Sequence, residues 1–264
     1  MTASHDPANT VATPAGNMHF VKKGSGYPLL LLHPLGTSTW AWHTVIDALS
    51  QHFTCYAFDM LGHGKSDKPN RHFNIPDYAQ ALDHACRALD IGRGHIVGNS
   101  VGAILAAETA ASFPELCDRL VLIGCPVWDS FTAKQRLKET LSGYDDQGLP
   151  KIRTVQEMKE GTTFAEPKQE WVDAMNGTRA QAGLWVGKLM ESLANYDVMS
   201  RLPRIRASAT LVMYGEVDRL RDGEDLLHNN IVNASKNVLP GLGHIPQIEG
   251  PEDFVGALLP FLQN

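Results

Sequence analysis

The chain has 264 residues, of which 43% are hydrophobic and 20% charged, as in globular proteins that bury a substantial core. Its formal net charge of -6, with lysine and arginine scattered along the chain, argues against nucleic acid as a partner. The four cysteines lie far apart, with no CxxC pair and no companion histidines at metal-ligand spacing, so we expect neither a disulfide scaffold nor a metal site. No stretch reaches the ~18 apolar residues of a membrane span, and no signal peptide is visible, so we expect a cytoplasmic protein that does not bind membranes.

In chain order, residues 1–17 are expected to form a loose N-terminal leader. The near-continuous apolar run at 28–33 then suits a strand buried on both faces of a parallel sheet. Further apolar runs and helix-like segments alternate after it, the runs at 54–58, 95–97, 119–123, 209–214 and 236–239, and the helices at 39–51, 76–89, 101–113 and 249–262. This alternation predicts an α/β fold with a doubly wound, mostly parallel sheet, in which ligands bind at the carboxyl ends of the strands.

The alternation stops between residues 126 and 202. Only helix-compatible segments occur there, at 132–142, 167–175 and 179–193. We therefore predict a helical cap over residues 126–202, inserted into an α/β core formed by residues 18–125 and 203–264. Trp128 and Trp185 of this cap are expected to contact a ring-bearing or medium-chain small molecule, although packing of the cap on the core would explain each of them equally well.

The five residues 98–102, "GNSVG", join the apolar run at 95–97 to the helix-like segment that follows. In this strand, turn and helix context, Gly-x-Ser-x-Gly is typical of a nucleophile elbow, a strained turn that raises the serine above the sheet edge. An ordinary polar turn is the alternative. We predict that Ser100 is the nucleophile and that the N–H of Val101, at the start of a helix, points into the same space.

A serine hydroxyl needs a base within hydrogen-bond reach, and the base needs a third group to orient it. His244 follows the run at 236–239 and precedes the last helix, whereas His228 lies inside a helix-like segment. Asp218, in the loop after residues 209–214, is the expected acid, with Glu216 as the alternative. The order Ser, Asp, His along the chain is the one this architecture uses.

The N–H of Val101 is expected to bind the oxyanion that forms when the serine attacks a carbonyl. A second N–H donor to the oxyanion should come from the loop after the run at 28–33. Because Pro34 has no N–H, Leu35 is the residue able to donate. Donors of this kind contribute ~3 kcal/mol each to the stabilisation of a transition state. We expect His33 to shape this loop rather than to act as a base.

Five motifs, "LLLHPLG", "FDMLGHGKSD", "GNSVG", "YGEVD" and "GHIPQIEGPEDF", have the order and spacing of the α/β-hydrolase family, which the chain resembles from about residue 17 onward. The resemblance implies a hydrolase without cofactor. Serine in the elbow argues against the branches that use aspartate there. In this family the stretch 58–67 is a structural loop, so His63 and Ser66 are not expected to be catalytic.

Two short likenesses bear on the substrate. The Gly-Asn-Ser elbow is similar to that of hydrolases that cleave C–C bonds in ring-fission products, but those commonly carry tryptophan where this chain has Ile245. The loop at 33–37 is instead similar to that of enol-lactonases. We predict hydrolysis of a small carboxylic ester or lactone, with C–C hydrolysis as the alternative and a ligand receptor or perhydrolase as weaker ones. Ile245 is expected to line the substrate pocket, and the oligomeric state is left open.

Overall fold

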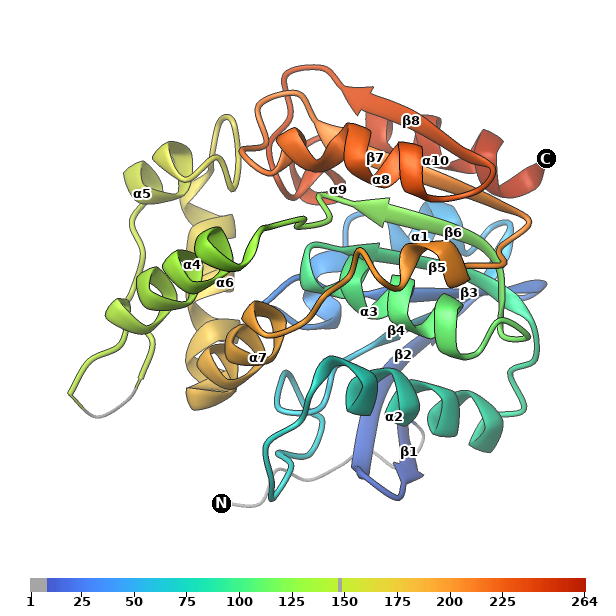
Figure 1. Cartoon of the computed structure of the whole chain (residues 1–264), viewed down its shortest axis with the longest axis horizontal. Coiled ribbons are helices and arrows are strands. Elements are labelled where there is room, and N and C mark those ends of the chain that lie inside the picture. Colours follow the sequence, from blue (N-terminus) through green and yellow to red (C-terminus); the bar gives the residue numbers. More distant parts are fainter. Residues whose placement is uncertain (1–8, 147–148) are drawn as a thin grey trace.

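The computed structural model of the chain describes residues 9–146 and 149–264. Eight strands among these residues form one sheet, in the spatial order β1-β2-β4-β3-β5-β6-β7-β8 (Figure 1). Strand β2 pairs antiparallel with both of its neighbours, and all other pairs are parallel. The strands are β1 (Thr10–Thr13), β2 (Gly16–Lys23), β3 (Tyr27–Leu32), β4 (Phe53–Phe58), β5 (Gly94–Asn99), β6 (Cys117–Ile123), β7 (Ala209–Gly215) and β8 (Ala234–Leu239).

Most helices outside the β6–β7 connection link consecutive strands. The linking helices are α1 (Ile46–Leu49), α2 (Ile75–Ala88), α3 (Val101–Ser112) and α8 (Glu224–Asn230), with 3-10 turns at Thr39–Trp42 and Arg221–Gly223. After β8 come α9 (Pro246–Glu249) and α10 (Pro251–Gln263), and a 3-10 turn at Leu202–Arg204 precedes β7. The helix predicted over 39–51 is a 3-10 turn followed by the short α1, because the N–H of Val45 reaches only three residues back, to Trp42. The helix predicted over 249–262 is preceded by α9 and opens on Pro251, a residue suited to a first helical turn.

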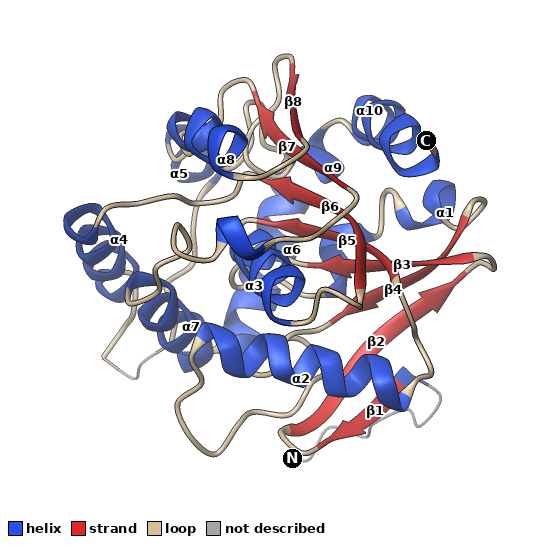
Figure 2. Ribbon diagram, turned by 45° about the vertical axis from the view of Figure 1, so that its right-hand side comes forward, coloured by secondary structure: helices blue, strands red, loops and turns tan. Residues whose placement is uncertain are grey.

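Helices cover both faces of the sheet (Figure 2). Successive residues of β3 point to opposite faces, as the two-residue repeat of a strand requires. Leu30 and Leu32 pack in a cluster with residues of α2 and α3, whereas Leu29 and Leu31 pack in a second cluster with residues of α1 and α10. All residues of β4 and β5 are buried. The prediction of a doubly wound, mostly parallel sheet is therefore confirmed.

The prediction of a loose leader is wrong for residues 10–17. Residues Thr10–Thr13 form β1, which pairs antiparallel with the start of β2 and buries Val11 against the core. Only one residue of this four-residue edge strand is buried, so its sequence shows no apolar run. Residues 1–8 of the expected leader lie outside the described residues.

Between β6 and β7 the described chain forms α4 (Ser130–Ser142), α5 (Val155–Glu160), α6 (Gln169–Ala182) and α7 (Leu184–Ala194), which lie together beside one end of the sheet (Figure 1). The division into core and cap at residues 126 and 202 stays a proposal. The separation of α6 and α7 occurs later than predicted, at Gly183, whose φ of 55° suits glycine. Among the helices of the described ranges, none has the length and hydropathy needed to cross a bilayer.

Candidate active site

Ser100 occupies the sharp turn between β5 and α3. Its φ of 59° and ψ of -121° lie in a region that residues other than glycine rarely adopt. A Cβ atom at Gly98 would lie 2.1 Å from the carbonyl oxygen of Gly102, and one at Gly102 would lie 2.3 Å from that of Leu32. Both glycines are therefore required for the strand and the helix to meet at this turn, which has the geometry expected of a nucleophile elbow.

His33 holds the loop that carries Leu35. The backbone N–H of Met60 donates to His33 Nε2 at 3.0 Å, so the ring proton is on Nδ1, which donates to the carbonyl of Pro34 at 2.9 Å. Burial lowers the pKa of His33, which keeps the ring neutral in this arrangement. These contacts agree with the predicted loop-shaping role. Helix α6 also binds this loop, because Thr178 Oγ1 donates to the carbonyl of Gly36 at 3.0 Å.

Asp218 and His244 follow β7 and β8 and meet beyond the end of the sheet. His244 Nδ1 lies 2.8 Å from Asp218 Oδ2, the Asp218 side chain is fully buried, and the His244 side chain is 17% exposed. The other carboxylate oxygen of Asp218 accepts the N–H of Leu220 at 2.9 Å. A Cβ at Gly124 would lie 2.7 Å from His244 Nδ1, so glycine at this position leaves room for the pair.

The alternatives to these two residues make other contacts. The carboxylate of Glu216 is exposed and accepts the N–H of Gly241 at 2.8 Å. His228 lies near the end of α8, where its Nδ1 is 3.2 Å from the side-chain oxygen of Asn229. The structure therefore brings Asp218, and not Glu216, to the imidazole of His244.

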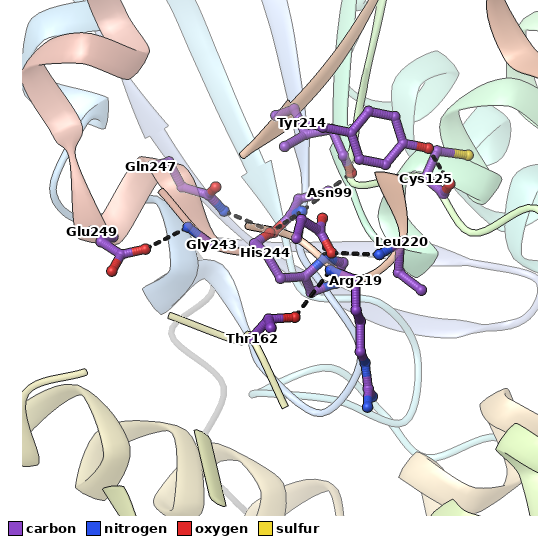
Figure 3. A network of polar contacts seen from close by, with 12 residues as sticks. Asn99, Cys125, Thr162, Tyr214, Arg219, Leu220, Gly243, His244, Gln247 and Glu249 are labelled. Atoms are coloured by element: carbon purple, nitrogen blue, oxygen red, sulfur yellow. Dashed lines mark hydrogen bonds and ion pairs between the residues drawn. The ribbon is translucent and has the colours of Figure 1, made fainter. Parts of the chain in front are cut away.

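Asn99, beside Ser100, attaches the loop that carries His244 to the sheet; this loop, residues 240–245, is here called the histidine loop. Its amide nitrogen donates to the carbonyls of Ile123 and His244 at 3.2 and 3.1 Å, and its oxygen accepts from Gln247 at 3.1 Å (Figure 3). The side chain is fully buried and does not line the cavity described next. In this chain the asparagine of the Gly-Asn-Ser sequence therefore holds the histidine loop by hydrogen bonds and does not face the cavity.

A cavity of about 540 Å³ lies in front of Ser100 and His244. Of the other residues predicted from the sequence, it is lined by Leu35, Val101, Trp128 and Ile245. Trp185, also predicted there, is not among the lining residues, and its contact with a ligand stays a prediction. Its ring is buried against the backbone of Gly62, where an added Cβ would lie 2.7 Å from the ring, and the Lys188 ammonium lies 4.3 Å from the ring centroid.

Basic side chains line the same cavity, and sequence reasoning missed them. They outnumber the acidic ones, Glu139 and Glu157, and are Arg136, Lys151, Arg153, Arg179 and Arg219. The Arg136 guanidinium pairs with Glu139 at 3.0 Å. A protein of net charge -6 thus concentrates positive charge around this cavity.

Arg179, on α6, is 5% exposed, and among the described residues its guanidinium has no ion pair or hydrogen-bond partner. Burial, together with the nearby charge of Arg153, lowers its pKa to about 10. Its Nη1 would lie 3.2 Å from a Cβ at Gly36, so the guanidinium lies against the loop that carries Leu35. A buried cation without a partner is costly unless an anion joins it.

Comparison with known proteins agrees with this architecture. A model of the α/β hydrolase fold matches residues 27–251. A 2-hydroxymuconate semialdehyde hydrolase of Pseudomonas putida is 34% identical over 267 residues, which cover 93% of this chain and 90% of that protein. The solved enol-lactonase of Burkholderia xenovorans LB400 superposes with a TM-score of 0.76 at 20% identity, covering 97% and 100% of the two chains.

An uncharacterised protein of Mycobacterium tuberculosis is 43% identical over 100 residues, which are 38% of this chain and only 29% of that protein. This relative therefore says little about the activity of the whole chain. The family model and the Pseudomonas relative, in contrast, extend over most of it. The chain belongs to the α/β-hydrolase family.

Proposed function

We propose that the protein cleaves a small carboxylic ester or lactone through an acyl-enzyme on Ser100. The observation that carries the proposal is the joint placement of three groups. Ser100, on its strained turn, lines the same cavity as His244, whose Nδ1 is held by the buried carboxylate of Asp218. With Nδ1 engaged, Nε2 is the imidazole nitrogen left to serve the serine.

In the first half-reaction, Ser100 Oγ attacks the carbonyl carbon while His244 Nε2 accepts the hydroxyl proton. Asp218 stabilises the imidazolium, and the N–H groups of Leu35 and Val101 bind the oxyanion. His244 then gives the proton to the leaving alkoxide, which departs as the alcohol, or stays attached at the far end of the acyl chain when the substrate is a lactone. A water molecule repeats these steps on the acyl-enzyme and releases the carboxylic acid.

Hydrolysis of a C–C bond next to a carbonyl is the second candidate, with the same serine, histidine and aspartate. The observation that favours it is the 34% identity to an enzyme named for 2-hydroxymuconate semialdehyde. Ile245, which lines the cavity directly after His244, and the supporting position of Asn99 favour the ester or lactone instead, because neither offers a polar group to a dienol.

Under both candidates, we infer that the substrate also carries a carboxylate. The support is the guanidinium of Arg179, which pairs with no described residue and lies against the loop that carries Leu35, here called the oxyanion loop. Arg153 and Arg219 line the same cavity. A carboxylate beside Arg179 would supply the negative charge that no residue of the described ranges provides there.

The test is turnover of four substrates by the purified protein: a neutral aryl ester, the same ester with a terminal carboxylate on its acyl chain, a lactone and a ring-fission dienone. We expect turnover of the acidic ester or the lactone and a loss of about 10³-fold or more in S100A and H244Q. Full turnover by S100A would refute the proposed function. Turnover of the dienone with refusal of both aryl esters would establish the second candidate instead.

A further inference from the structure

Residues 161–166, here called the strap, connect α5 to α6 and contact the loops that carry Asp218 and His244. The carbonyl of Thr162 accepts the backbone N–H of His244 at 3.0 Å. The hydroxyl of the same residue accepts the backbone N–H of Arg219, directly after Asp218, at 3.0 Å (Figure 3). One residue of the β6–β7 insertion thus holds the backbone of both loops.

Thr162 has an unusual backbone for its side chain. Its φ is 53°, in the left-handed region that β-branched residues rarely adopt. It follows the last turn of α5 in a Schellman arrangement, because its N–H bonds to the carbonyl of Lys159 and the N–H of Thr163 bonds to that of Met158. Glycine is the residue that fits this position without strain. Threonine adds a hydroxyl, which accepts the N–H of Arg219 in the loop that carries Asp218. This loop, residues 216–220, is here called the acid loop.

Further contacts join the strap to the histidine loop. A Cβ at Gly243 would lie 2.8 Å from Phe164 Cα, so the two backbones are in direct contact. Glu249, at the end of α9, bridges the two segments, because one carboxylate oxygen accepts the N–H of Gly243 at 2.7 Å and the other accepts that of Glu166 at 2.8 Å. The histidine loop is therefore clamped on the strap side, opposite the support it receives from Asn99.

From these contacts the structure assigns Thr162 as a positioning residue, whose carbonyl and hydroxyl hold the histidine and acid loops in register so that the Asp218 carboxylate stays on His244 Nδ1. The inference rests on the proposed function, because it concerns the same acid and base. Misplacement of a catalytic group by 1 Å can cost ~10²-fold in rate. Loss of one anchor of the acid loop should therefore reduce kcat by about 10-fold, with KM within about twofold of wild type.

Three substitutions separate the hydroxyl from the strain. T162V keeps the β-branched shape and removes the hydroxyl, T162S keeps the hydroxyl, and T162G removes both the hydroxyl and the strain. We expect T162V and T162G to lose activity and T162S to retain it. The low-field proton resonance of the His244 Nδ1 bond to Asp218 should broaden or disappear in T162V and T162G and persist in T162S.

The matched control is T54V. Thr54 Oγ1 donates to the carbonyl of Gly26 at 2.8 Å near the start of β4, at the opposite end of the sheet. T54V should lose thermal stability through its lost hydrogen bond but keep both kcat and the resonance. A decrease in kcat common to T54V and T162V would assign the loss to general destabilisation and overturn the positioning role.

Wild-type kcat and an unchanged resonance in T162V would also overturn the inference. If T162V does not fold, E249Q decides, because the amide nitrogen of glutamine cannot accept one of the two N–H groups that Glu249 now binds. A weaker resonance and a lower kcat in E249Q support positioning by the strap, and wild-type values refute it. The resonance requires no turnover, so it tests the strap even if S100A shows that the proposed function is wrong.

Discussion

Replacement of Arg179 by methionine should make the protein more stable and its proposed substrate selection weaker. The guanidinium is 5% exposed, and no described residue neutralises it. Since a factor of ten in an ionisation constant is worth ~1.4 kcal/mol, the fall of its pKa from 12.5 to about 10 corresponds to about 3 kcal/mol against the charged form in the folded state. The sign follows for a base: a folded-state pKa below the unfolded one destabilises the fold at every pH below that range, including neutral pH.

Methionine occupies a similar length of side chain without the charge, so R179M should gain about 1–3 kcal/mol in the free energy of unfolding, after some packing is lost. In a chain of this size, each kcal/mol raises the thermal midpoint by about 2–4 °C. Calorimetry or urea unfolding at pH 7 measures this gain. The control is R136M, because Arg136 lines the same cavity but pairs with Glu139 at the surface, where such pairs are worth ~0.2–1 kcal/mol.

The same variant should lose substrate selection. A charged hydrogen bond contributes ~1.5–3 kcal/mol, so kcat/KM for an ester with a terminal carboxylate should fall by about 10- to 100-fold in R179M, while kcat/KM for its neutral methyl ester stays within about twofold. A loss of stability greater than about 1 kcal/mol in R179M, or an equal loss for both esters, would contradict the reasoning, since either would mean that the guanidinium serves the fold.

The remaining predictions concern single groups. G124A should keep the fold by circular dichroism but lose about 10²-fold or more in kcat, because its Cβ would lie 2.7 Å from His244 Nδ1 and its φ of 53° is strained for alanine; near-normal kcat would contradict this. D218N should lose ~10⁴-fold in kcat with unchanged KM, because an amide favours the wrong imidazole tautomer; E216Q is the control. Burial lowers the pKa of His63 to about 3, so between pH 6.5 and 3 the unfolded chain binds a proton at this residue that the folded chain does not bind. Urea unfolding should therefore show the free energy of unfolding decreasing by up to ~1.4 kcal/mol for each unit by which the pH is lowered. H63Q should remove that share of the slope, and an unchanged slope would exclude His63 as its source.

The sheet and the residues around Ser100 could be predicted from the sequence, because short-range sequence patterns determine them. Apolar runs bounded by glycine and proline mark the buried strands, and the carboxyl ends of parallel strands lie at one edge, so Ser100, Asp218 and His244 could be placed together before any contact was known. Gly98 and Gly102 are part of the motif for a steric reason that the structure shows directly. Chain order then separated Asp218 from distant acids, although it did not by itself exclude Glu216.

The sequence did not show which way the side chains of the insertion point in the folded chain. Trp185 and Trp128 are both aromatic residues of the insertion, yet Trp185 packs on Gly62 and Trp128 faces the cavity, and no local pattern distinguishes the two. An arginine in a helix such as α6 is ordinarily solvated, so nothing in the sequence marks Arg179 as buried. The role of Thr162 is equally invisible, because it follows from one φ angle and from two loops that lie far along the chain.

Three of the contacts between the insertion and the site differ in their expected effects on activity. Thr178 binds the carbonyl of Gly36 in the oxyanion loop, Arg179 puts its charge beside that loop, and Thr162 holds the backbone of the acid and histidine loops. A substitution in the insertion can therefore alter rate as well as selection, and the two effects are separable. Changes at Arg179 should act on carboxylate-bearing substrates alone, whereas changes at Thr162 should lower kcat for every substrate by the same factor, because they act on the proposed base and acid.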